Sequence, residues 1–113
     1  MTVHKMKLSA IPFEKIVSGK KIIESRLYDE KRRQISLGDK INFTCSNNQS
    51  KSVSTTITAL YRYPNFENLF SDFSPSLFGG NSKEELIEEI KSFYSKEEQE
   101  KYGVIGIKIE VIK

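Results

Sequence analysis

The feature of this chain that most restricts its fold is a strict alternation of side chains near its C-terminus. In the segment VIGIKIEVI, Ile105, Ile107, Ile109 and Val111 stand at every second position. Successive side chains of a β-strand point to opposite faces, so these four would share the face that packs on a core. A strand of this kind needs neighbours. The sequence therefore predicts a sheet in which this last segment pairs with an earlier strand.

Further strand patterns fill the first 63 residues. Period-two alternation or a high content of β-branched and aromatic residues predicts strands in VHKMKL, KIIESRL, KINFTC and VSTTITALYRY. Pro64 ends the last of these. Between the last two, the segment 46–52 (SNNQSKS) has no core-forming residue, and we expect it to form an exposed hairpin loop.

Helical patterns separate and follow these strands. In IPFEKIV, Pro12 suits a first helical turn, Gly19 follows the end, and Phe13, Ile16 and Val17 would share one face. Capping-box patterns at Ser82–Glu85 and Ser95–Glu98 predict two more helix starts. Two longer apolar faces at helical spacing are expected to be buried: Phe66, Leu69, Phe70 and Phe73, and then Leu86, Ile87, Ile90, Phe93 and Tyr94. Residues 1–113 are therefore expected to form one α+β domain, a mixed sheet or small barrel with helices packed outside.

Composition narrows the class of protein. A chain of 113 residues with 37% apolar side chains can bury one core, and no apolar run approaches the roughly 20 residues of a membrane helix. The N-terminal segment lacks the apolar stretch of a signal peptide. A single cysteine, Cys45, fits a reducing compartment, so we expect a cytoplasmic protein. One His and one Cys make no zinc-type cluster, and we expect neither metal nor cofactor.

Charge is distributed unevenly along the chain. Residues 1–40 hold ten Lys or Arg and five Asp or Glu, whereas residues 66–101 hold four Lys and nine Asp or Glu. A basic N-terminal segment and an acidic later segment suit a protein that presents one face to an anion. An acidic helix that is simply solvated explains the second segment equally well.

The short stretch GKKIIESRL carries an unusual density of charge for a strand. Glu24 and Arg26 lie two residues apart and would share a face, where they can form an ion pair. Lys21 has the opposite parity and joins them only if a bulge or turn redirects it, which Gly19 makes feasible. These charges line either a polar cleft or an exposed sheet face, and the spacing alone does not decide between the two.

This stretch resembles the signature of the ASCH domain family, G-x-K-x-x-E-x-R, at all four named positions: Gly19, Lys21, Glu24 and Arg26. The resemblance continues through PFEKIVSGKK, ISLGDKINF, YPNFENLF and YGVIGIKIEV, close to the whole chain. It implies a PUA-like fold, a small pseudo-barrel with the signature residues in a cleft beside it. It also implies binding of RNA or of a ligand that bears a nucleobase.

Some members of the family resemble small enzymes, either N4-acetylcytidine amidohydrolases or a ribonuclease. The amidohydrolase branch combines the signature Lys with a Thr three residues later and a Glu before the long helix. Lys21 matches, but Glu24 stands at the Thr position and Gly79-Gly80 near the Glu position. The chain therefore departs from that branch at two of three positions.

Other basic residues and several tyrosines are candidates for contacts with a nucleic acid. Arg32 and Arg33 belong to the run EKRRQ, and with Lys20 and other lysines they could face phosphate groups. Tyr28, Tyr61 and Tyr63 are candidates to stack on a base. Ordinary surface charge and half-buried packing are the competing interpretations for these two sets.

These patterns lead to a hypothesis of a module that binds RNA or a nucleotide. In this hypothesis Glu24 accepts hydrogen bonds from a base edge, Arg26 orients Glu24 or grips phosphate, and Lys21 contacts phosphate or a carbonyl. The alternative is a small hydrolase of a modified nucleoside or of RNA, with Lys21 and Glu24 as the chemical pair. A third possibility is a protein-interaction domain that uses the acidic helix within residues 82–94.

Overall fold

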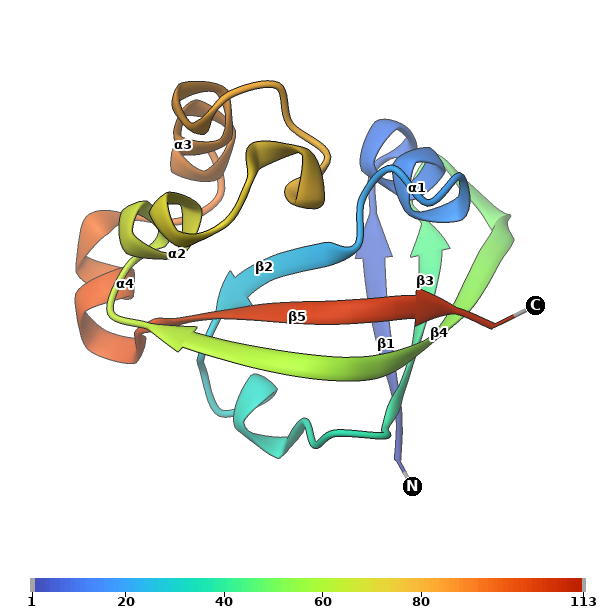
Figure 1. Ribbon diagram of the computed structural model, residues 1–113. Helices are drawn as coiled ribbons and strands as arrows, with labels where there is room; N and C mark the ends of the chain where they lie inside the picture. The colour runs from blue at the N-terminus through green and yellow to red at the C-terminus, as the bar shows by residue number, and fades with distance from the viewer. Residues whose placement is uncertain (1, 113) are drawn as a thin grey trace.

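A computed structural model describes residues 2–112 (Figure 1). Its strands and helices follow the chain in this order: β1 (Val3–Leu8), α1 (Ala10–Val17), β2 (Ile23–Leu27), the 3₁₀ helix η1 (Arg32–Gln34), β3 (Lys40–Cys45), β4 (Asn48–Tyr63), α2 (Phe66–Asp72), the 3₁₀ helix η2 (Pro75–Phe78), α3 (Lys83–Lys91), α4 (Lys96–Tyr102) and β5 (Val104–Val111).

The five strands form one sheet in the order β1-β3-β4-β5-β2. β1 runs parallel to β3, and the other neighbours are antiparallel. β5 lies between β4 and β2, which confirms that the last strand pairs with an early one. The sheet curls into a half-barrel whose two edges are β1 and β2 (Figure 1). The expected α+β class, with helices packed outside a curled mixed sheet, is confirmed.

β5 shows how one strand serves two cores. Ile105, Ile107 and Ile109 point into the core inside the half-barrel, as the alternation predicts, and all three are buried. Val104 belongs to a second core on the opposite face, which the helices after β4 cover. Gly106 stands on that face as well, where a Cβ atom would come within 3.0 Å of Leu69. The glycine therefore lets α2 approach the sheet closely.

The helices after β4 gather beside β2, whereas α1 lies next to the C-terminal ends of β1 and β3 (Figure 1). Side-chain caps fix where they begin. The Ser82 hydroxyl accepts a hydrogen bond from the Glu85 backbone N–H at the start of α3, and Ser95 with Glu98 forms a complete capping box at α4. Both starts agree with the sequence patterns. Asn65, which the patterns did not single out, caps α2 in the same way.

The exposed hairpin after β3 is confirmed, but the predicted length of its loop and the predicted burial of one helix residue are wrong. The segment 46–52 is mostly strand, because Ser46 and Asn47 alone make the turn and β4 begins at Asn48. Its side chains are exposed, but ladder hydrogen bonds between backbones do not require apolar side chains. Phe93, which was expected on a buried helix face, has an exposed fraction of 71%. It follows the end of α3 at Lys91, where the chain leaves the core.

Candidate functional site

A cavity of about 440 Å³ lies where the half-barrel is open, between the two edge strands. The end of β1 contributes one side, β2 contributes the floor, and residues of α2, η2, α3 and the segment after α3 contribute the other side. This volume falls within the range of about 300–1,000 Å³ that is usual for small-molecule sites. The site thus depends on parts of the chain that are far apart in sequence.

The turn between α1 and β2 delivers Lys21 to this cavity. Gly19 adopts a φ of 80°, and the backbone N–H groups of Lys20 and Lys21 both donate to the carbonyl of Lys15, at 2.9 and 3.0 Å. β2 begins only at Ile23, so Lys21 precedes the strand and its parity does not apply. The redirection that the sequence left open is therefore present.

Gly79 makes room for this lysine. A Cβ atom on Gly79 would come within 3.1 Å of the Cβ of Lys21. The Gly79 carbonyl also accepts a 2.6 Å hydrogen bond from the ammonium of Lys15. With a φ of 80°, this glycine lies in a backbone conformation that other residues rarely adopt. The loop after η2 thereby supports the turn that carries Lys21.

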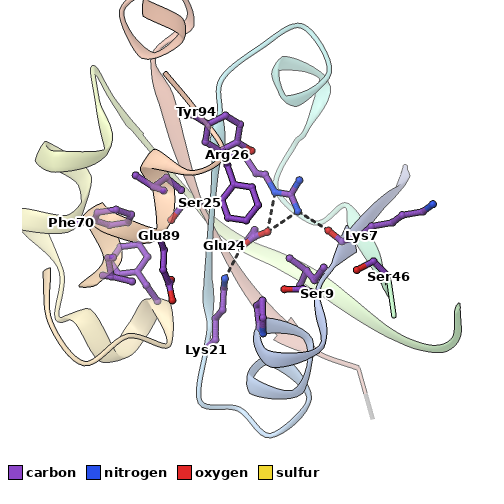
Figure 2. A pocket seen from close by; sticks show the side chains of 16 residues that line it. Lys7, Ser9, Lys21, Glu24, Ser25, Arg26, Ser46, Phe70, Glu89 and Tyr94 are labelled. Atoms are coloured by element: carbon purple, nitrogen blue, oxygen red, sulfur yellow. Dashed lines mark hydrogen bonds and ion pairs between the residues drawn. The ribbon is translucent and has the colours of Figure 1, made fainter. Parts of the chain in front are cut away.

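Lys21, Glu24 and Arg26 converge on the cavity floor (Figure 2). The Lys21 ammonium lies 2.8 Å from Glu24 Oε1, and Arg26 Nη2 lies 2.8 Å from Glu24 Oε2. Arg26 Nε also donates to Oε2, at 2.9 Å. The Glu24 side chain is only 5% exposed, and those of the two cations are 13% and 15% exposed. Each cation thus holds one oxygen of a buried carboxylate.

The electrostatics of this triad keep Glu24 and Arg26 ionised. Burial alone would raise the pKa of Glu24, but the adjacent charges and hydrogen bonds of Lys21 and Arg26 outweigh it and lower the pKa to about 2. Burial likewise opposes the charge of Arg26, but Glu24 and then Tyr94 raise the pKa of its guanidinium. At neutral pH Glu24 is therefore an anion that lies against the charged guanidinium of Arg26.

Arg26 also spans the opening between the two edge strands. Its Nη2 donates a 3.2 Å hydrogen bond to the backbone carbonyl of Lys7 in β1 (Figure 2). The Lys7 carbonyl is available because β1 is an edge strand that pairs with β3 on its other side. Glu24 thus fixes a guanidinium that connects β2 to β1 across the cavity.

The remaining walls are apolar and aromatic, and the sequence patterns did not identify them as part of a site. Their members come from α2, η2, α3 and the segment that follows: Phe70, Phe78, Leu86, Ile90, Phe93 and Tyr94. Polar side chains line the rim: Lys7, Ser9, Ser25, Ser46 and Glu89. Phe93 is the one large apolar side chain of this wall that is mostly exposed, which distinguishes it from core packing. Exposure cannot be read from a helical period, so the sequence carried no signal for this role.

Two sequence candidates from the α1–β2 turn lie outside this cavity. Gly19 and Lys20 are exposed and border shallower depressions on the other side of the turn. Lys21 borders one of those depressions too, so it stands between the cavity and the outer surface.

The basic run and Tyr28 lie together at the opposite end of β2. The Arg32 guanidinium pairs with Asp29 at 3.2 Å, and Arg33 donates to the Tyr28 carbonyl at 3.3 Å. The Tyr28 ring is covered by cations, with Arg62 centred 4.2 Å and Arg33 5.1 Å from its centroid. The structure therefore does not bring Tyr28, Arg32 or Arg33 to the cavity.

Tyr61 and Tyr63 also lie elsewhere, on β4 against Phe73. The Tyr61 and Phe73 ring centroids are 4.6 Å apart, and Tyr63 meets Phe73 edge-on at 6.5 Å. The Tyr63 hydroxyl donates to Asp72 at 2.5 Å, and this hydrogen bond raises the pKa of the phenol. Both rings act in packing, which is the competing interpretation for them.

Two features are absent from residues 2–112, a metal-binding cluster and a membrane-spanning helix. In that range no group of three or more His, Cys, Asp and Glu side chains could hold a metal ion. None of the helices described there has the length and apolar character needed to span a bilayer.

Comparisons with solved structures define the class of this fold. The crystal structure of hypothetical protein PH0355 is 36% identical, with a TM-score of 0.87 over 98% of this chain and 100% of that one. The solution structure of protein PF0455 from Pyrococcus furiosus is also 36% identical, with a TM-score of 0.78 and 99% of each chain covered. An ASCH domain from Lactobacillus crispatus shares 15% identity and a TM-score of 0.68, over 96% of this chain and 79% of that chain. The architecture is thus the PUA-like fold of ASCH domains.

The profile of the ASCH domain family matches residues 6–113. The chain belongs to the ASCH domain family. No curated protein matches the chain.

Proposed function

We propose that this domain binds RNA or a nucleotide-like molecule by accepting one nucleobase-bearing unit in the cavity between β1 and β2. The convergence of Lys21, Glu24 and Arg26 beneath an aromatic wall carries this proposal. Unstacked bases in single-stranded RNA are commonly held by aromatic stacking and by hydrogen bonds to their edges. Both kinds of group are available here within one cavity of suitable volume.

Lys7 at the rim suits the phosphate of such a ligand. Lys7 lines the cavity from β1 and is exposed, so it can meet a phosphate without leaving its strand. The basic N-terminal third of the sequence contributes both edge strands. Phosphate contacts of this kind add affinity that is independent of base sequence and sensitive to salt.

The hydrolase alternative has less support from the geometry. A general base needs a pKa near the working pH, but the pKa of Glu24 is about 2 and both of its oxygens are already held by cations. Such a carboxylate is a weak proton acceptor and a good fixed hydrogen-bond acceptor. Turnover of acylated nucleosides or single-stranded RNA that disappears in Glu24→Gln would favour the hydrolase.

The decisive experiment removes the cations and measures the affinity for mixed-sequence single-stranded RNA by fluorescence anisotropy at fixed salt. The double variant Lys21→Ala/Arg26→Ala should lose about tenfold or more in affinity, because each lost charged hydrogen bond is worth ~1.5–3 kcal/mol. Since this variant leaves Glu24 buried and unpaired, a triple variant with Met, Leu and Met at 21, 24 and 26 keeps the volume and removes all three charges. The matched control is Lys96→Ala/Lys101→Ala in α4, which removes two exposed charges away from the cavity. Equal losses in the cavity and control variants, each checked for folding by circular dichroism, would contradict the proposal.

A further inference from the structure

The cavity floor presents its hydrogen-bonding groups in a fixed sequence. Lys21 and Arg26 flank Glu24 on opposite sides, so the floor reads donor, acceptor, donor (Figure 2). The Lys21 ammonium has three N–H groups, of which the pair with Glu24 uses one. The guanidinium has five, of which Glu24 takes two and the Lys7 carbonyl one. Each carboxylate oxygen can accept more than one hydrogen bond. All three groups therefore keep capacity for a ligand.

The charge in the middle of this row decides which ligands suit it. Glu24 is ionised, buried and held in place from both sides. A phosphate group laid across the floor would place its own oxygens against the carboxylate, which is unfavourable at close range in a buried site. A neutral group with an acceptor, an N–H donor and a second acceptor would satisfy all three side chains together. In organic rings this arrangement is the imide, –CO–NH–CO–.

We infer that the cavity selects a planar ring with an imide edge, of which uracil is the example in RNA. The two carbonyl oxygens of the ring accept from Lys21 and Arg26, and the N–H between them donates to Glu24. Cytosine has a lone pair in place of that N–H and an amino group in place of one carbonyl, so it opposes the floor at two positions. Adenine offers no carbonyl, and guanine matches two of the three groups. This inference rests on the proposed function and specifies its ligand.

The wall provides a place for the flat face of such a ring. Tyr94 is fixed by stacking on Phe66, with centroids 5.5 Å apart and planes 21° apart, and Figure 2 shows its side chain beside Arg26. Phe93 follows α3, lines the cavity and exposes 71% of its surface. Stacking on a base would bury this ring, at a usual gain of about fivefold to a hundredfold in affinity for a base on an aromatic side chain. Phe93 would therefore provide affinity, and the floor would provide selectivity.

The test changes the ligand and leaves the wild-type protein intact. Calorimetry compares uridine 5′-monophosphate with cytidine 5′-monophosphate and with N3-methyluridine 5′-monophosphate, which lacks the N–H and carries a methyl group toward Glu24. We expect the uridine nucleotide to bind about tenfold to a hundredfold more tightly than either, since a well-matched pair of base contacts discriminates by about that factor. Short oligo(U) and oligo(C) RNAs form a second arm. Tight binding of oligo(U) alone would identify a base within an RNA strand, and tight binding of the mononucleotide as well would identify a free nucleotide.

Two variants assign the roles of floor and wall. Phe93→Ala should weaken binding of every probe by a similar factor and leave the ratio of uridine to cytidine affinity unchanged. Glu24→Gln should reduce that ratio, because an amide no longer supplies a fixed acceptor between the two cations. Equal affinity for all nucleotides would overturn the imide inference but not the proposed function. A preference for cytidine or for the N3-methylated ligand would also overturn the imide inference alone. If no nucleotide or RNA binds, the imide inference and the proposed function are both overturned.

Discussion

Two basic stretches stand close together in the sequence, yet their surroundings in the folded protein differ. GKKIIESRL and EKRRQ both mix Lys, Arg and Glu within nine residues or fewer. In the first, Lys21 and Arg26 enclose a buried carboxylate on the floor of a cavity. In the second, Arg32 and Arg33 bind locally to Asp29 and to the backbone and ring of Tyr28. Burial and convergence, and not charge density, therefore distinguish a candidate site from a basic surface.

The two stretches should differ most in stability when one arginine is removed from each. Arg26→Ala leaves Glu24 buried with only one cation, so we expect a loss of about 3 kcal/mol in the free energy of unfolding. Arg32→Ala breaks a pair whose Asp29 side chain is 30% exposed, and about 1 kcal/mol or less is expected. Urea denaturation followed by circular dichroism measures both. Similar losses in the two variants would show that the triad is energetically an ordinary surface pair.

Acid provides the second test. The pKa of Glu24 is lowered from 4.5 to about 2, so its ionisation stabilises the folded state fully above pH 4.5. That contribution, roughly 3 kcal/mol, is lost as the pH falls through the folded pKa of about 2. The difference in unfolding free energy between the wild type and Glu24→Gln should therefore shrink between pH 5 and pH 2. Urea titrations at several pH values check this, and a constant difference would contradict it.

The smallest effect is expected in the basic run itself. Lys31→Ala/Arg33→Ala removes two cations at the end of β2 opposite the cavity, so RNA affinity should fall by no more than about threefold per charge. The loss should be equal for all base sequences, and the dependence of affinity on salt should become less steep. Anisotropy titrations at several salt concentrations measure both quantities. A change in base preference would place this run within the site and remove the distinction between the two stretches.

Much of the fold could be predicted because its signals are local. The alternation through Ile105 and Ile107 fixes the inner face of β5, and the serine caps fix the starts of α3 and α4. The hairpin around Ser46-Asn47 was predicted, but with too long a loop, because exposed polar residues extend a strand through backbone bonds that leave no side-chain pattern.

The candidate site was predictable only in part. Its charged residues could be chosen from the signature, but the parity of Lys21 left its direction open until the turn at Gly19 and the contact with Gly79 were known. The aromatic wall could not be chosen at all. Phe93 sits at a helical spacing that predicts burial, and only the end of α3 and the packing of three separate elements make it part of a cavity.

The hydrogen bond from Arg26 to the Lys7 carbonyl has a mechanical consequence. Neighbouring strands within the sheet are joined by ladders of backbone hydrogen bonds. The two edge strands, β1 and β2, are instead joined by the guanidinium of Arg26. A molecule bound in the cavity would add contacts between β1 and β2, which no backbone ladder joins. Occupancy and stiffness of the domain would then rise together, and the empty protein would be the looser of the two forms.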